Sequence, residues 1–316
     1  RALLHQARDL GINLLDTAPA YGISEERLGP LLRGQRQDWV IVSKVGEEFV
    51  NGASLFDFSP AHTRLSVERS LKRLETEHIE LVLVHSDGND LAILHDSGIY
   101  ATLAELKREG KIGAFGLSGK TVAGGLLALE QGDCAMVTYN LNEQAERPVL
   151  DYAAEHGKAI LVKKALASGH VCLSPGVDPV RASFELLFQQ PGVASAIVGT
   201  INPLHLAHNV GTVAQVLGGE VERGTLAGGR AGQLQFNGGI AQYQRVPVLE
   251  AAQAADRVVH DRHLAVGLDA FGDVTLARQT DANDDEQASH DPQGDQELDN
   301  TGHSESLRGR SHGRVD

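Results

Sequence analysis

Seven short apolar runs, each followed by an amphipathic helical pattern, constrain the fold of this chain more than any other feature. The runs are rich in Val, Ile and Leu and cover residues 12–18, 39–44, 79–86, 112–119, 135–140, 159–166 and 195–200. Short runs of this kind, nearly continuous in apolar residues, are typical of parallel strands that are buried on both faces. Their alternation with helices as far as residue 217 predicts a parallel sheet covered by helices.

The number of runs raises the question of how this sheet closes. A parallel barrel of this class has eight strands, and a helical pattern at residues 1–11 precedes the first of the seven runs. We therefore expect a (β/α)8 TIM barrel that lacks its first strand, which would lie upstream of Arg1. An open doubly wound sheet is the alternative, but no Gly-rich dinucleotide fingerprint follows any run. The stretch GLSGKTVAGG, residues 116–125, has its glycines at the wrong intervals.

The chain changes character after residue 217. We expect residues 1–217 to form the barrel and residues 218–316 to form a Gly-rich and then acidic polar tail that is mostly disordered, because its last 36 residues are almost wholly polar. Residues 247–259 and 263–271 keep some helical or strand pattern. Neither forms a run convincing enough to predict that the tail closes the barrel.

Composition excludes several classes of function. A formal net charge of −14 argues against general nucleic-acid binding, which needs a basic surface. The two cysteines, Cys134 and Cys172, have no metal-like spacing and are expected to be reduced. The tail histidines are irregularly spaced, so no metal site is expected. No apolar run reaches the roughly 20 residues of a membrane span and no signal peptide opens the chain, so a cytoplasmic protein without a membrane partner is expected.

Ionisable residues end the first three apolar runs. Asp16, Lys44 and His85 stand at these ends, and Tyr21 follows Asp16 across a short turn. In a parallel barrel the carboxyl ends of the strands meet at one rim, where catalytic residues lie. Each residue also has a structural interpretation: Asp16 as a turn former, Lys44 as a solvated strand end, His85 as a core histidine bonded to backbone, and Tyr21 as a rim aromatic. One mechanism that uses all four favours the functional interpretation.

That mechanism is acid-assisted hydride transfer to a carbonyl. A tyrosine hydroxyl, with a pKa of about 10, is a poor acid, but a neighbouring ammonium stabilises the phenolate and lowers that pKa. A buried lysine keeps its proton when a carboxylate holds it charged, which is a role for Asp16. A neutral imidazole at His85 could donate to and orient the carbonyl oxygen. Asp16, Lys44, Tyr21 and His85 thus form a complete set for proton delivery.

The stretch LLDTAPAYGISEERLG, residues 14–29, resembles the early signature of the aldo-keto reductases, D-T-A-x-x-Y-G followed by S-E-x-x-L-G. The family's catalytic tetrad corresponds to Asp16, Tyr21, Lys44 and His85, and the similarity covers about residues 1–210. The resemblance implies a reductase or dehydrogenase that acts on a small carbonyl or sugar substrate, with NADP bound along the barrel without a Rossmann domain.

The strongest cofactor motif is IVGTINPLHLAHNV, residues 197–210, which is similar to the family's late adenosine-phosphate segment. Asn202 caps a helix that Pro203 opens, and its free N–H groups form an anion site. The resemblance places the adenosine end of the cofactor along the following residues: Gly199, Thr200, Asn202, His205 and Asn209. An ordinary capped helix is the structural alternative.

The same resemblance implies nicotinamide-side contacts from Ser118 and Asn140, for which a turn-forming Asn is the structural alternative, and in this region the chain departs from the family pattern. Gly119 replaces the usual Asn after Ser118. Lys163-Lys164 replaces an aromatic residue that usually stacks on the nicotinamide, and either lysine could contact the cofactor pyrophosphate or stay solvated. Gly199 and His205 replace a frequent Lys and Arg pair, so NAD stays open beside NADP. Other readings left open are a non-catalytic, cofactor-binding regulatory subunit of the same superfamily and a defective truncated product. The sequence does not fix the oligomeric state.

Overall fold

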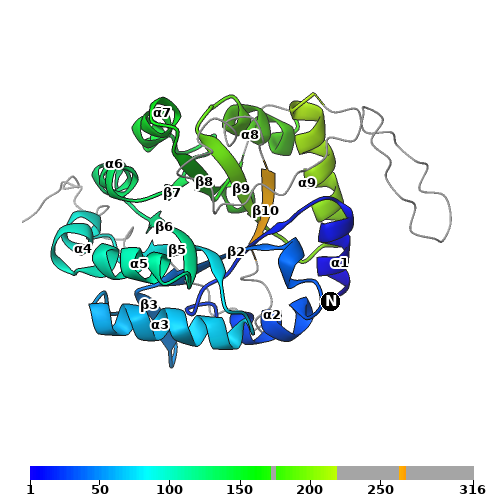
Figure 1. Cartoon of the computed structure of the whole chain (residues 1–316). Coiled ribbons are helices and arrows are strands. Elements are labelled where there is room, and N and C mark those ends of the chain that lie inside the picture. Colours follow the sequence, from blue (N-terminus) through cyan, green and yellow to red (C-terminus); the bar gives the residue numbers. More distant parts are fainter. Residues whose placement is uncertain (172–175, 219–262, 268–316) are drawn as a thin grey trace, which may run out of the picture. The chain divides into compact units, whose positions relative to one another are not determined.

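The computed structural model describes residues 1–171, 176–218 and 263–267. For residues 263–267 it describes the backbone only. Among these residues the parallel strands form a closed barrel in the order β1-β10-β9-β8-β7-β6-β5-β2, and β3 and β4 form a separate two-stranded sheet. Helices surround the barrel strands (Figure 1). The expectation of a parallel barrel is confirmed, and the open doubly wound sheet is excluded.

All seven predicted runs contain a barrel strand, and helices follow most of them along the chain. The strands are β1 (Leu14–Asp16), β2 (Val40–Val45), β3 (Glu47–Val50), β4 (Ala53–Phe56), β5 (Ile79–His85), β6 (Ile112–Ser118), β7 (Cys134–Thr138), β8 (Ala159–Lys163), β9 (Val193–Gly199) and β10 (His263–Gly267). The α-helices are α1 (Ala2–Asp9), α2 (Ser24–Leu32), α3 (Pro60–Arg73), α4 (Asp90–Asp96), α5 (Ile99–Arg108), α6 (Val122–Gln131), α7 (Arg147–Glu155), α8 (Pro179–Phe188) and α9 (Pro203–Val216), with short 3-10 turns at Arg36–Asp38 and Ala167–Gly169.

Strand β10 differs from the sequence expectation. Its residues 263–267 pair in parallel with β9 on one side and with β1 on the other, and they occupy the place expected to stay vacant (Figure 1). The segment comes from the region expected to be a tail, so a late part of the chain stands in the position of the first strand. A run of five residues is too short to be recognised as a strand from the sequence alone, without knowledge of the strands with which it pairs. The expected disorder of the remaining tail lies outside the described residues.

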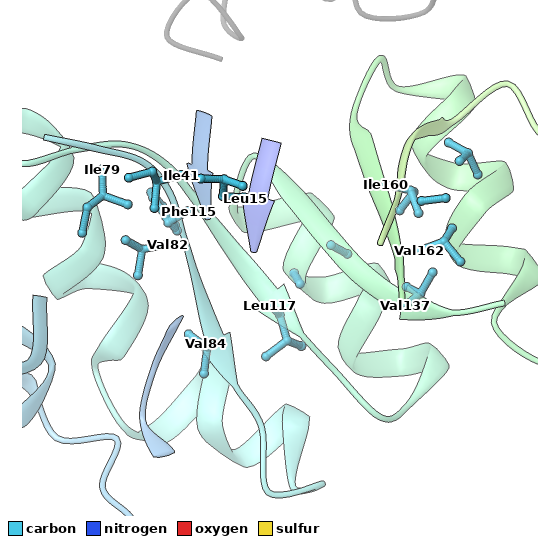
Figure 2. Packing of buried hydrophobic residues seen from close by; sticks show 14 of the residues in the cluster. Leu15, Ile41, Ile79, Val82, Val84, Phe115, Leu117, Val137, Ile160 and Val162 are labelled. Carbon is cyan, nitrogen blue, oxygen red and sulfur yellow. The ribbon is translucent and has the colours of Figure 1, made fainter. Parts of the chain in front are cut away.

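The strands separate two apolar cores. Alternate residues of the strands pack outward against the helices, and Figure 2 shows ten of these side chains: Leu15, Ile41, Ile79, Val82, Val84, Phe115, Leu117, Val137, Ile160 and Val162. The intervening residues fill the barrel interior in a smaller cluster: Val42, Leu81, Leu83, Ala114, Cys134, Met136 and Leu161. Because side chains alternate across a strand, the near-continuous apolar runs of the sequence supply both cores.

Closure of the barrel by β10 predicts a dependence of stability on the late segment. A chain that ends at Gly218 lacks β10, so β1 and β9 are left with unpaired edges. We expect this chain to aggregate and to lose its cooperative thermal transition, measured by circular dichroism and size-exclusion chromatography. A chain that ends at Asp273 keeps β10 and the first of the two compact units of the molecule, residues 1–273, and serves as the control. Equal melting midpoints for the two chains would show that β10 is dispensable.

Candidate active site

The polar residues of the candidate site are the last inward-facing residues of successive barrel strands. Inward-facing positions follow the interior core by steps of two: Leu83 leads to His85, Met136 to Thr138 and Leu161 to Lys163. The same step reaches Lys44 on β2, Asp16 on β1 and Ser118 on β6. The barrel interior is therefore apolar below and polar at the end where the strands run into their loops, which is where barrel enzymes carry their chemistry.

Asp16 and Lys44 form a buried ion pair in this polar layer. The Lys44 ammonium donates to Asp16 Oδ1 at 2.7 Å and to the carbonyl oxygen of Thr17 at 3.0 Å. The Lys44 side chain is 2% exposed and the Asp16 side chain is 5% exposed. Burial alone would lower the pKa of Lys44, but the charge and hydrogen bond of Asp16, together with Tyr21, outweigh it and raise that pKa above the ordinary 10.5. Lys44 is therefore a charged ammonium inside the barrel, and not a solvated strand end.

Tyr21 and His85 complete the cluster. The Lys44 ammonium lies 4.6 Å from the centre of the Tyr21 ring and donates a hydrogen bond to the Tyr21 hydroxyl. The Tyr21 and His85 rings meet edge to face, with their centres 6.1 Å apart. The structure thus brings together all four residues that the sequence singled out.

The second half of the early signature has a structural role. Ser24, the first residue of α2, shares a 2.8 Å hydrogen bond with Thr17, which follows Asp16. Glu25 is 1% exposed and accepts a 2.7 Å hydrogen bond from Ser43, the neighbour of Lys44. Burial raises the pKa of Glu25, although hydrogen bonds from Ser43 and Ser70 and the charge of Arg73 act to lower it. The motif therefore fixes α2 against the strand ends that carry Asp16 and Lys44.

Sequence reasoning missed Glu47. The segment after Lys44 contains the β3-β4 hairpin, which begins after Gly46 turns the chain with a φ of +100°. Glu47 Oε2 lies 2.6 Å from Nδ1 of His85, and Glu47 Oε1 accepts a 2.6 Å hydrogen bond from Ser54. No pattern in the sequence marks this glutamate, because the pairing depends on how the hairpin folds back toward β5.

Sequence reasoning also missed Asp90, a buried carboxylate at the start of α4. Asp90 Oδ2 accepts hydrogen bonds from Lys120 N at 2.9 Å, Thr121 N at 2.8 Å and Thr121 Oγ1 at 2.7 Å. Its other oxygen accepts from the Ser86 hydroxyl. Since Ser86 follows His85 and Lys120 follows the Ser118-Gly119 turn, Asp90 ties together the loops after β5 and β6.

Lys163 reaches across the barrel to Ser118. Its ammonium donates to Ser118 Oγ at 3.1 Å and to Gly119 O at 2.8 Å. β7 lies between β8 and β6 in the sheet, so this side chain passes over one strand inside the barrel. Burial lowers the pKa of Lys163 to about 8, and the charge of Lys44 contributes to that shift while Glu146 opposes it. No carboxylate oxygen among the described residues lies within ion-pair distance of this amine.

Asn140 is buried and its side chain shapes a turn. Its Oδ1 accepts from Asn142 N at 2.9 Å and Glu143 N at 3.0 Å, and its Nδ2 donates to Lys164 O at 3.1 Å. The turn-forming role that the sequence left open is therefore present. Whether this residue also contacts a cofactor stays a prediction.

The helix start after β9 has the geometry that the sequence predicted. Asn202 caps α9 by accepting from Leu204 N at 2.9 Å, and Pro203 opens the helix. Thr200 Oγ1 accepts from Asn202 N at 3.1 Å. Gly199 and His205 are exposed. Asn209, one turn beyond His205, is buried. Thr200, Asn202 and His205 lie at or next to the N-terminus of α9, where an anion site forms, whereas Asn209 is the seventh residue of the helix.

The remaining expectations concern metal ligands, cysteines and membrane spans. No group of three or more potential metal ligands occurs among the described residues. Cys134 is buried and unbonded, and its burial raises its pKa. Cys172 and the tail histidines lie outside the described residues. No helix in the described part is long and apolar enough to cross a membrane.

The barrel carries a buried lysine, a carboxylate, a phenol and an imidazole at its mouth, and comparison with known proteins gives the family of oxidoreductases to which the chain belongs. The Aldo/keto reductase family model matches residues 1–173. The chain belongs to the aldo/keto reductase family, whose members use NADP(H).

Individual relatives agree with this assignment. The chain is 76% identical to PA4992 of Pseudomonas aeruginosa, described as an aldo-keto reductase, over 68% of this chain and 82% of that one, with a TM-score of 0.65. It is 27% identical to the oxidoreductase YqkF of Bacillus subtilis, over 66% of this chain and 80% of that protein. An aldo-keto reductase of Klebsiella pneumoniae in complex with NADPH shares the fold at 24% identity and a TM-score of 0.54, over 67% of this chain and 78% of that one.

The buried ion pair predicts a specific pattern of stability. Asp16→Asn leaves the Lys44 ammonium buried without its counter-charge, so we expect the free energy of unfolding to fall by about 3–5 kcal/mol. Urea denaturation measures the loss. The double variant Asp16→Asn with Lys44→Met removes the orphaned charge and should recover most of the stability. A single variant as stable as the parent protein would show that the pair carries no such energy.

Proposed function

We propose that this protein is an NAD(P)H-dependent carbonyl reductase, which in the reverse direction acts as an alcohol or aldose dehydrogenase, with Tyr21 as the general acid. The observation that carries the proposal is the Lys44 ammonium held between the Asp16 carboxylate and the Tyr21 hydroxyl. Asp16 keeps Lys44 charged. That charge in turn stabilises the phenolate that Tyr21 becomes once it has given up its proton.

The reaction balances with these groups. Reduction of a carbonyl adds a hydride to carbon and a proton to oxygen, and the C=O double bond becomes a C–O single bond. When bound, the nicotinamide cofactor supplies the hydride. Tyr21 supplies the proton, and the negative charge left on its oxygen faces Lys44. To His85, whose ring meets Tyr21 edge to face, we assign the role of contacting and orienting the substrate carbonyl.

The residues present fit a phosphate-bearing nicotinamide cofactor. The capped N-terminus of α9, with exposed Gly199 and His205 beside it, offers N–H groups to an anion. At the other end of the proposed site, Ser118 offers a hydroxyl and Lys163 a cation. The charge of Glu146 acts on this cation, but no carboxylate oxygen of the described part of the chain comes within ion-pair distance of it. We infer that the adenosine end lies along Gly199, Thr200, Asn202, His205 and Asn209. NADP is favoured on family grounds, and NAD stays an alternative.

The central test replaces the acid without removing the ring. Tyr21→Phe should lower kcat by about 10²–10⁴-fold, because a positioned general acid contributes that much, while the affinity for NADPH stays unchanged. Fluorescence titration measures the affinity, and absorbance of NADPH with a reactive aldehyde measures turnover. Tyr152→Phe, on the outer helix α7, is the matched control. Full activity in Tyr21→Phe would remove Tyr21 from its role, and absence of turnover in the parent protein would favour a regulatory subunit.

Lys163 predicts a pH dependence of cofactor binding. Its pKa is lowered to about 8 by burial, so the ammonium is present below that pH and is lost as the pH rises through it. If Lys163 faces an anionic cofactor, the affinity for NADPH should fall between about pH 7 and pH 9 in the parent protein. Lys163→Met should bind more weakly at pH 7 and show no such fall, whereas Lys164→Met, at an exposed neighbour, should keep it. Parallel titration curves for the parent and Lys163→Met would contradict the assignment.

A further inference from the structure

Lys163 carries an amine at the barrel mouth that the proposed reaction uses only as a charge. It is the last residue of β8, and its amine donates to Ser118 Oγ at 3.1 Å and to Gly119 O at 2.8 Å, both of which are uncharged acceptors. The Lys44 amine differs, because Asp16 Oδ1 lies 2.7 Å from it. Lys163 is only partly buried, so small molecules that enter the mouth can reach its amine.

The surroundings of Lys163 favour the neutral form of its amine. Burial lowers the pKa of Lys163 to about 8, and the positive charges of Lys44 and Lys164 act in the same direction, while Glu146 and Asp90 oppose them. A lysine amine attacks a carbonyl only after it has lost its proton, and burial or a neighbouring cation is what makes a lysine nucleophilic near neutral pH. Relative to the ordinary lysine pKa of about 10.4, a pKa of about 8 gives roughly 10²-fold more neutral amine at pH 7.

The amine of Lys163 lies near the candidate catalytic residues but differs from Lys44 in chemistry. Burial lowers the pKa of His85, and the charges of Lys44 and Lys163 add to this effect, which places both amines near the imidazole. Lys44 cannot attack a carbonyl, because Asp16 and Tyr21 raise its pKa and keep it protonated. Lys163 has no such partner among the described residues, so its amine is the better nucleophile of the two.

We propose that Lys163 is a covalent site for small aldehydes, which it captures as a Schiff base when no cofactor occupies the mouth. The lone pair of the amine attacks the carbonyl carbon, and the carbinolamine that forms then loses water. A C=N bond replaces the C=O bond, and the two hydrogens of the neutral amine leave with the oxygen. Nothing is oxidised or reduced, so water reverses the capture. The ammonium form of Lys163, which the proposed cofactor binding uses, does not react.

Reductive trapping measures the capture without NADPH. The full chain is incubated with propanal and sodium cyanoborohydride, which reduces a Schiff base to a stable secondary amine, and peptide mass spectrometry locates the lysines that gain a propyl group. At pH 7 Lys163 should be labelled about tenfold faster, or more, than the exposed Lys164 and Lys120. Its labelling rate should rise with pH and level off above about pH 8. Labelling of Lys163 no faster than that of the two exposed lysines overturns the proposal.

A variant of Glu146 tests whether the surrounding charges control the amine. Glu146 is 5% exposed, its charge keeps the proton on Lys163, and its Oε2 accepts from Thr138 N at 2.7 Å, a bond that an amide oxygen can also accept. Glu146→Gln should therefore label faster at pH 7 and level off at a lower pH than the parent protein, whereas Glu143→Gln, at an exposed neighbour, should match the parent.

Two lysine variants identify the amine that reacts. Lys163→Met should lose the fast labelling and Lys164→Met should keep it. An unchanged pH profile in Glu146→Gln, or fast labelling that survives in Lys163→Met, contradicts the assignment. Because the assay contains no cofactor, its result is independent of the proposed reductase activity.

Discussion

The ion pair of Asp16 and Lys44 is the constraint on which the rest of the site depends. An ammonium that is 2% exposed is stable inside a protein only when a counter-charge and hydrogen bonds replace its water. Asp16 supplies the charge from the neighbouring strand and the Thr17 carbonyl supplies a further acceptor. The adjacent contacts of Ser24 with Thr17 and of Glu25 with Ser43 hold the two strand ends in place. The rigid position of Lys44 follows from these contacts, and so does the proximity of Tyr21.

The barrel explains why its charged groups gather in one layer. Its interior is filled by side chains such as Leu83, Met136 and Leu161, which pack without polar partners. One step of two residues along each strand leads out of this core to His85, Thr138 and Lys163. At that level the loops add acceptors and donors, as Glu47 and Asp90 show, so charged groups find partners there that the apolar layers below cannot offer.

The sequence predicted the strands and the tetrad because both depend on local pattern. Seven apolar runs and three ionisable strand ends are readable from short windows, and the parallel sheet brings those ends together whatever the loops do. Strand β10 was missed because residues 263–267 form a strand only by pairing with β9 and β1, which lie far away in the sequence. Glu47 and Asp90 were missed for the same reason. Each contacts residues that only the folded chain brings close, so no spacing in the sequence marks it.

The charges at the barrel mouth are paired unevenly. On one side Lys44 is neutralised by Asp16, and the Glu47 carboxylate faces the His85 imidazole at 2.6 Å. On the other side Lys163 donates to Ser118 Oγ and Gly119 O, and the charge of Glu146 acts on it although no carboxylate oxygen of the described residues comes within ion-pair distance. Because a buried cation without a close counter-charge loses its proton more readily than a paired one, the pKa of Lys163 is lowered while that of Lys44 is raised. The partners of each lysine therefore decide which of the two keeps its charge as the pH rises above neutral.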